Sequence, residues 1–138
     1  MKPGSAGLLI RRIYALCLLV ATGTHAAPLI QHGVFWDYGG AAPVTVVFWT
    51  SLAVADPLAA ACLFIWPRLG LVLTSGIIGL DVIHNAIVFS DALLRPSAVH
   101  LWTYIAFGLQ LAFLLFVGAT VRVPWSRAPK ERATPSAA

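Results

Sequence analysis

A short polar stretch, LDVIHN at residues 80–85, interrupts an apolar segment that runs from residue 70 to residue 90. Its three strongly polar residues, Asp81, His84 and Asn85, are spaced so that they share one face of a helix. An ionised side chain at the centre of a bilayer costs at least ~2.5–3.5 kcal/mol, so such residues are candidates for function. Asp81 and His84 lie one turn apart, and we expect that they could share a proton.

Three other apolar segments each carry a polar side chain at a similar depth, namely His25, Asp56 and Gln110. At ~1.5 Å per residue from the predicted cytoplasmic boundary, Asp56, Asp81 and Gln110 lie ~15–16 Å deep, and His25 and His84 lie ~18–21 Å deep. These depths predict a polar layer near the midplane to which every segment contributes. Within it, we expect His25 to face Asp56 as a partner.

The composition indicates that these segments lie in a membrane. Of the 138 residues, 59% are hydrophobic and 10% are charged, and the mean hydropathy is +0.86. A soluble domain carries about 25% charged residues. A chain of this length cannot bury so much apolar surface in a core of its own, so the excess must face lipid.

The sequence predicts an all-α, polytopic membrane protein, a bundle of four transmembrane helices. Each segment is close to the ~20 residues that a spanning helix needs. Short stretches with turn-forming residues, among them HGVFWDYGGAAP and PRLG, separate them. The predicted transmembrane domain covers residues 13–121, with spans at 13–30, 43–66, 70–90 and 99–121.

The basic residues predict the orientation, because Lys and Arg in short loops stay in the cytoplasm. If the chain crosses four times, eight of the nine basic residues fall on one side and Arg95 falls on the other. We therefore expect a multi-pass protein of the cell inner membrane with a cytoplasmic N-terminus (residues 1–12) and a disordered cytoplasmic tail (residues 122–138). The eight residues on the cytoplasmic side are Lys2, Arg11, Arg12, Arg68, Arg122, Arg127, Lys130 and Arg132.

The aromatic residues agree with this threading, with one exception. Trp36, Tyr38 and Trp102 map to the outer boundary, where amphipathic rings prefer the headgroup region. Trp49 instead lies about two turns below that boundary, counted by helical rise.

The N-terminus has a second interpretation, a secretory signal peptide with a small-x-small cleavage site at Thr24-His25-Ala26. The mature chain would then begin at Ala27 and would lack the first span and His25. The apolar pattern continues to Ile30, which is longer than an ordinary signal sequence, and this favours an uncleaved helix. The mass of the purified protein distinguishes the two.

The polar layer admits three functions. The first is a site for a proton or a small ligand, as in a component of a transporter, formed by Asp56, Asp81, His84, Asn85, His25 and Gln110. The alternative is a structural or accessory membrane subunit, in which polar side chains only join helices, at an average of ~0.6 kcal/mol per hydrogen bond. This second role is the ordinary explanation of Gln110.

The third function is haem binding by two histidines, His25 and His84, because four-helix bundles hold cofactors between facing helices. We otherwise predict no cofactor and no metal. The predicted partners are the lipid bilayer and either a second copy of the chain or another membrane protein. Nucleic acid is not expected, since the basic residues form no patch interleaved with aromatics.

An enzyme is the least supported class. The sequence contains neither G-x-S-x-G nor H-E-x-x-H. Cys17 and Cys62 form no C-x-x-C motif, so thiol–disulfide exchange is not indicated.

The segment FWTSLAVADPLAAACLFIWPRLGLVLTSGIIGLDVIHN, residues 48–85, resembles the small, mostly uncharacterised four-span proteins of bacterial inner membranes. In overall plan the chain is similar to DoxX-like proteins. The resemblance implies a bacterial inner membrane and carries over no functional residue.

Overall fold

The structure, a computed structural model, describes residues 5–93 and 101–128 of the chain. Over these residues it is all-α, which confirms the predicted fold class. Four of the helices are long and apolar enough to cross a membrane. The helices are α1 (Ser5–His32), α2 (Pro43–Ile65), α3 (Pro67–Leu93), α4 (Leu101–Thr120) and a short α5 (Arg122–Arg127).

Each predicted span corresponds to one of the long helices. The helix α1 begins eight residues before the predicted span, at Ser5, because the segment before residue 13 contains good helix formers as well as its two arginines. The predicted second span ends at Trp66, which is the single residue between α2 and α3. Residues 99–100 of the fourth predicted span lie outside the described residues.

Two residues, Pro67 and Gly70, permit the tight turn between α2 and α3. Pro67 is the first residue of α3. The N–H group of a residue at this position makes no hydrogen bond within the helix, so proline, which has no N–H, costs nothing there. Gly70 lies so close to α2 that a Cβ atom there would overlap the backbone of Leu63. The absence of a side chain at Gly70 therefore permits the two helices to meet.

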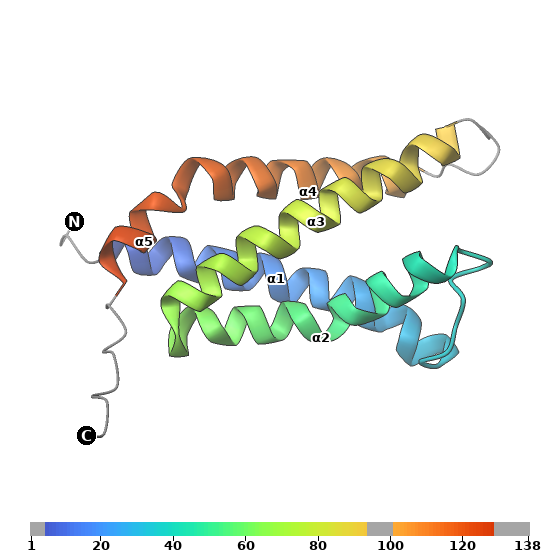
Figure 1. Cartoon of the computed structure of the whole chain (residues 1–138), viewed down its shortest axis with the longest axis horizontal. Coiled ribbons are helices and arrows are strands. Elements are labelled where there is room, and N and C mark those ends of the chain that lie inside the picture. Colours follow the sequence, from blue (N-terminus) through green and yellow to red (C-terminus); the bar gives the residue numbers. More distant parts are fainter. Residues whose placement is uncertain (1–4, 94–100, 129–138) are drawn as a thin grey trace, which may run out of the picture.

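The long helices form two pairs, α1 with α2 and α3 with α4 (Figure 1). The pairs converge where α5 lies, which we call the α5 end, and diverge at the opposite end, which carries residues 33–42 and which we call the loop end. The helices α2 and α3 pack along one another between the pairs, whereas α1 and α4 have few contacts. The core is apolar and includes Tyr14, Leu18, Ala59, Leu63, Leu71, Ile78 and Val117.

At the α5 end, hydrogen bonds and aromatic contacts fasten α1 to its neighbours. The hydroxyl of Tyr14 is hydrogen-bonded to that of Thr120 at 2.7 Å, and its ring makes edge contacts with Phe113 and Phe116. Tyr14 has no solvent exposure. The guanidinium of Arg11 donates to the carbonyl oxygen of Leu63 at 3.0 Å. These contacts hold α1 against both α2 and α4 at this end.

The expectation of disorder from residue 122 onward is wrong for residues 122–127, which form α5. Pro124 is buried against α1, where a Cβ atom at Gly7 would lie 3.5 Å from its Cα atom. The guanidinium of Arg68 lies 5.7 Å from the ring centre of Trp125. The physical reason is that Pro124 supplies apolar surface that this end of the bundle buries, while Trp125 stays exposed beside Arg68. Residues 129–138 of the predicted tail lie outside the described residues.

Candidate functional site

Asn85 is the centre of a hydrogen-bond network that joins three helices. Its side-chain oxygen accepts a hydrogen bond from the indole N–H of Trp49 on α2, at 3.0 Å. Its side-chain nitrogen donates to Asp81 Oδ1 at 2.7 Å and to Gln110 Oε1 on α4 at 3.1 Å. Asp81 and Asn85 are four residues apart, so the helix itself places their side chains together. The network brings together three of the predicted site residues and adds Trp49.

Asp56, on α2, differs from the members of the network because one of its carboxylate oxygens has no hydrogen-bond partner among the described residues. It is 2% exposed, and its Oδ2 atom is buried with no hydrogen-bond partner among the described residues. A buried polar group in a native structure is normally hydrogen-bonded, and an exception requires an explanation. Asp81 is almost as buried, at 5% exposed, but has Asn85 as a partner.

Both carboxylates line one cavity in the middle of the bundle. We call this cavity, of about 380 Å³, the acidic chamber; Asp56 and Asp81 form one wall, and α1 and α4 form the others. Toward the loop end it adjoins a second cavity of about 320 Å³, the aromatic chamber, which is lined by Tyr38, Trp49 and Trp102. The two chambers share wall residues, among them His25 and Gln110. Together they form a cleft between α1 and α4.

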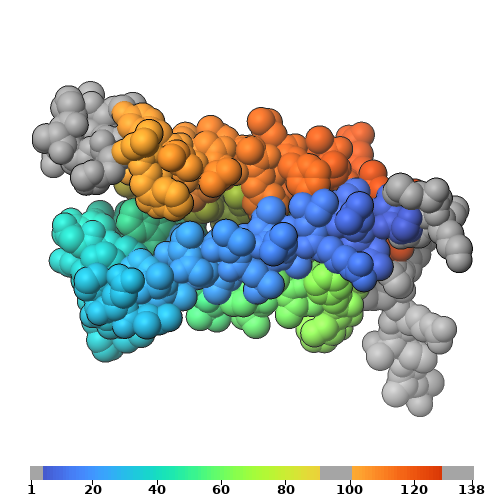
Figure 2. All heavy atoms as spheres, turned by 180° about the vertical axis from the view of Figure 1, so that it is seen from behind, coloured from blue at the N-terminus to red at the C-terminus, as the bar shows by residue number. Residues whose placement is uncertain are grey.

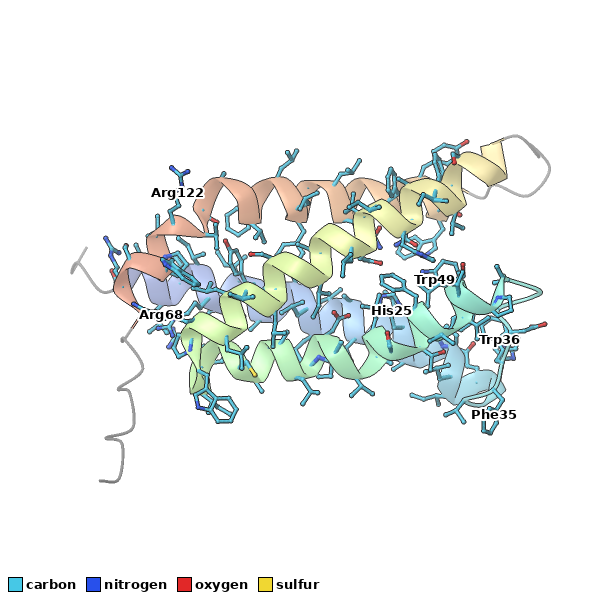
Figure 3. All side chains as sticks on the ribbon, in the orientation of Figure 1. His25, Phe35, Trp36, Trp49, Arg68 and Arg122 are labelled. Atoms are coloured by element: carbon cyan, nitrogen blue, oxygen red, sulfur yellow. The ribbon has the colours of Figure 1, made fainter. Side chains whose placement is uncertain are left out.

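The figures show where this cleft lies. In the space-filling view, the surface is hollowed between α1 and α4 (Figure 2). His25 and Trp49 lie toward the loop end, between the two helix pairs, while Arg68 and Arg122 lie at the α5 end (Figure 3). The cleft exists because α1 and α4 are fastened at the α5 end and separate toward the loop end.

The two histidines of the predicted site occupy different environments. His25 is half-buried and lines both chambers, but no hydrogen bond joins it to Asp56. His84 lines neither chamber; its ring lies 4.4 Å from that of Phe48, centre to centre, and its Nε2 atom is buried without a partner among the described residues. Asp81 is therefore paired with Asn85 in place of the expected His84.

Three aromatic residues of the cleft were not predicted as site residues. Trp49 and Trp102 line the aromatic chamber, and Tyr38 lies beside them with its ring 5.3 Å from that of Trp49. Tyr38 has a φ of 55°, a left-handed conformation that is uncommon outside glycine and that the two glycines after it extend. One sequence signal was available for Trp49, because its depth in the membrane did not fit an interfacial role.

The histidine positions bear on the haem hypothesis. A haem held by His25 and His84 needs both rings to face one cavity, and His84 faces Phe48 outside both chambers. The residues present therefore do not fit bis-histidine ligation. Within residues 5–93 and 101–128, no three His, Cys, Asp or Glu side chains gather closely enough to hold one metal ion.

Comparisons with protein families, with curated proteins and with solved structures found no match to this chain. The candidate site therefore stands on its own geometry, and the resemblance to DoxX-like proteins adds no argument to it.

Proposed function

We propose that the protein is an inner-membrane protein that binds a small molecule or a proton within the bilayer, in the cleft between α1 and α4. The observation that carries this proposal is Asp56, a carboxylate that lines the acidic chamber and has a buried oxygen without a partner among the described residues. A residue of this kind is costly to bury, and an apolar residue in its place would pack equally well. A cationic ligand in the chamber, or a proton on the carboxylate, would offset this buried negative charge.

The size and lining of the cleft support a ligand site. Binding sites for small molecules are mostly apolar concavities of about 300–1,000 Å³ with a few convergent polar groups. The acidic chamber, at about 380 Å³, has this character, with Asp56, Asp81, His25 and Gln110 as its polar groups. A bound molecule would place its polar end at the carboxylates and its apolar part along the helices.

The network around Asn85 favours a second function, the structural role. Its three hydrogen bonds join α2, α3 and α4, and such bonds are what a packing layer consists of. This role explains Asn85 and Gln110 without a ligand. It does not explain Asp56, and for this reason we favour the ligand site.

The orientation in the membrane is part of the proposal. Among the described residues, the α5 end carries Arg11, Arg12, Arg68, Arg122 and Arg127, and the loop end carries the acidic Asp37. The positive-inside rule then supports a cytoplasmic α5 end, and with it two cytoplasmic termini. Reporter fusions at residue 37 and at the C-terminus would test this orientation.

Equilibrium binding to the purified full-length protein in dodecyl maltoside tests the ligand site. The probes are three compounds of similar shape: the cation tetraphenylphosphonium, the anion tetraphenylborate and the neutral triphenylphosphine oxide. We expect at least one to bind saturably, with one molecule per chain. Saturable binding by none of the three would contradict the small-molecule site and leave only the proton.

A matched pair of variants places the binding in the cleft. Ala106 lines both chambers, and Ala112 is exposed on the same helix and lines neither. We expect Ala106→Phe to fill the cleft and to weaken probe binding at least tenfold, whereas Ala112→Phe leaves it within twofold. Equal effects of the two variants would show that the probes bind elsewhere.

A further inference from the structure

The charges around the acidic chamber are of one sign. Asp56 faces it from α2 and Asp81 from α3. Of the described residues that line either chamber, none is Lys or Arg, and the remaining titratable groups are His25, Cys17 and Tyr38. The carboxylates therefore have no fixed cation to balance them. A buried charge is normally either paired or neutralised by a proton, so the complement of this chamber, when its carboxylates are ionised, is a positively charged group.

The walls of the cleft provide favourable surfaces for an organic cation. Trp49 and Trp102 line the aromatic chamber and Tyr38 stands at 5.3 Å from Trp49, so that indole and phenol rings surround the space that adjoins the acidic chamber. The face of an aromatic ring attracts a cation by about 0.5–1 kcal/mol at an exposed site and by about 2 kcal/mol or more where water is excluded. The remaining lining is mostly aliphatic, which excludes a strongly hydrated ion.

The mouth of the cleft faces lipid. Leu16 and Val20 on α1 and Leu109 on α4 line the acidic chamber and are 63%, 62% and 62% exposed. Side chains that are apolar, exposed and in the middle of a spanning helix contact the hydrocarbon of the bilayer. A molecule that passes between them comes from the lipid, and it must itself be hydrophobic.

From these three observations we propose that the ligand of the cleft is a hydrophobic organic cation, such as a quaternary ammonium or phosphonium ion or a protonated lipophilic amine. This inference rests on the proposed function and names the class of molecule for the same site. Asp56, which has the unpartnered oxygen, is the principal counter-ion, and Asp81 adds to the negative charge of the chamber while its Oδ1 accepts from Asn85.

The probes test the sign of the charge, because tetraphenylphosphonium and tetraphenylborate carry the same four phenyl rings and opposite charges, and triphenylphosphine oxide is a somewhat smaller neutral compound. With the wild-type protein we expect tetraphenylphosphonium to bind at least tenfold more tightly than triphenylphosphine oxide, and tetraphenylborate to show no saturable binding. Asp56→Asn should weaken tetraphenylphosphonium at least tenfold and leave triphenylphosphine oxide within twofold. Asp56→Glu, which keeps the charge, should restore most of the selectivity.

Asp37→Asn is the matched control for charge. It removes the same charge from the exposed loop, where the Asp37 carboxylate accepts a hydrogen bond from the backbone of Gly39. We expect it to leave all three affinities unchanged. Binding measurements on Asp56→Asn require a helical circular-dichroism spectrum like that of the wild type. Where that condition fails, Asp81→Asn, which removes the other carboxylate of the chamber, should also weaken tetraphenylphosphonium more than triphenylphosphine oxide.

The outcomes separate this inference from the proposed function. If the cation, the anion and the neutral probe bind equally to the cleft, the site exists and the inference of cation selection is wrong. If Asp56→Asn leaves the affinity for tetraphenylphosphonium unchanged, the inference is likewise wrong. If no probe binds, the proposed small-molecule site itself fails.

Discussion

At the α5 end of the bundle Tyr14 joins α1 to α4, whereas toward the loop end the same two helices stand apart with a cleft between them. The closed end combines a buried aromatic ring, close backbone contact at Gly70 and a hydrogen bond from Arg11. The open end contains large aromatic residues, Trp49 and Trp102, that line space without filling it.

This difference shows that the chain uses the same kinds of residue for two purposes. A membrane bundle gains no hydrophobic free energy from helix association, so close packing and hydrogen bonds must hold it together. The α5 end meets that requirement. The helices at the loop end can then leave a cavity, and the cavity is where the unpaired carboxylate of Asp56 lies.

The largest effect is expected from Tyr14→Ala, which removes the fastening of the closed end. Tyr14 is fully buried, and truncation of a buried aromatic residue costs ~3–5 kcal/mol of the free energy of unfolding. The matched control is Tyr104→Ala at the loop end, where Tyr104 is exposed and touches Phe89; we expect ~1 kcal/mol or less there. Unfolding by dodecyl sulfate, followed by circular dichroism, measures both. Equal losses would contradict the difference between the ends.

A smaller loss is expected from Gly70→Ala. The new Cβ atom would overlap the backbone of Leu63, and overpacking of this kind costs ~1–3 kcal/mol. In the same helix a Cβ atom added at Gly76 would meet no other heavy atom within 4 Å, so Gly76→Ala should raise stability by up to ~1 kcal/mol through helix propensity. The two variants should therefore differ in sign in the same unfolding assay. A stabilising Gly70→Ala would show that α2 and α3 do not meet as closely as described.

The smallest effects, of opposite sign, are expected from the two carboxylates. Asp56→Leu replaces a group with an unpartnered oxygen and should raise the free energy of unfolding by ~1 kcal/mol. Asp81→Leu leaves the amide of Asn85 without one of its acceptors and should lower it by ~1 kcal/mol. Thermal unfolding in dodecyl maltoside compares them. A destabilising Asp56→Leu would indicate that Asp56 has a structural partner and would weaken the case for a ligand.

The sequence was sufficient to predict the four long helices, and it also predicts a common depth for their polar residues. Apolar length and turn chemistry locate four spans, and helical rise places Asp56, Asp81 and Gln110 at one level. The structure joins Asp81 to Gln110 through Asn85, in keeping with that level. These features depend on spacing along a single helix, which a sequence states directly.

The contacts between helices could not be predicted in the same way. Whether Asp81 pairs with His84 or with Asn85 depends on how α3 is rotated, since both are within one turn of it. The rotation depends on neighbours such as Trp49 and Gln110, which lie 36 and 25 residues from Asn85 in sequence. The cleft likewise depends on the angle between two helix pairs. The sequence did not predict α5 because its apolar segment is short, and this segment is buried only through its contact with α1, which is far away in sequence.

The bond between Tyr14 and Thr120 also has a consequence for how the protein is made. The two residues are 106 positions apart, so the bond joins α1 to α4, which is synthesised after α2 and α3. While α1, α2 and α3 are already in the membrane, the wall of the acidic chamber that α4 forms is still missing. A chain that stops before α4 leaves Asp56 and Asp81 beside lipid, at a cost of ~2.5–3.5 kcal/mol for each ionised group. The insertion of α4 therefore both forms the bond to Tyr14 and completes the cleft.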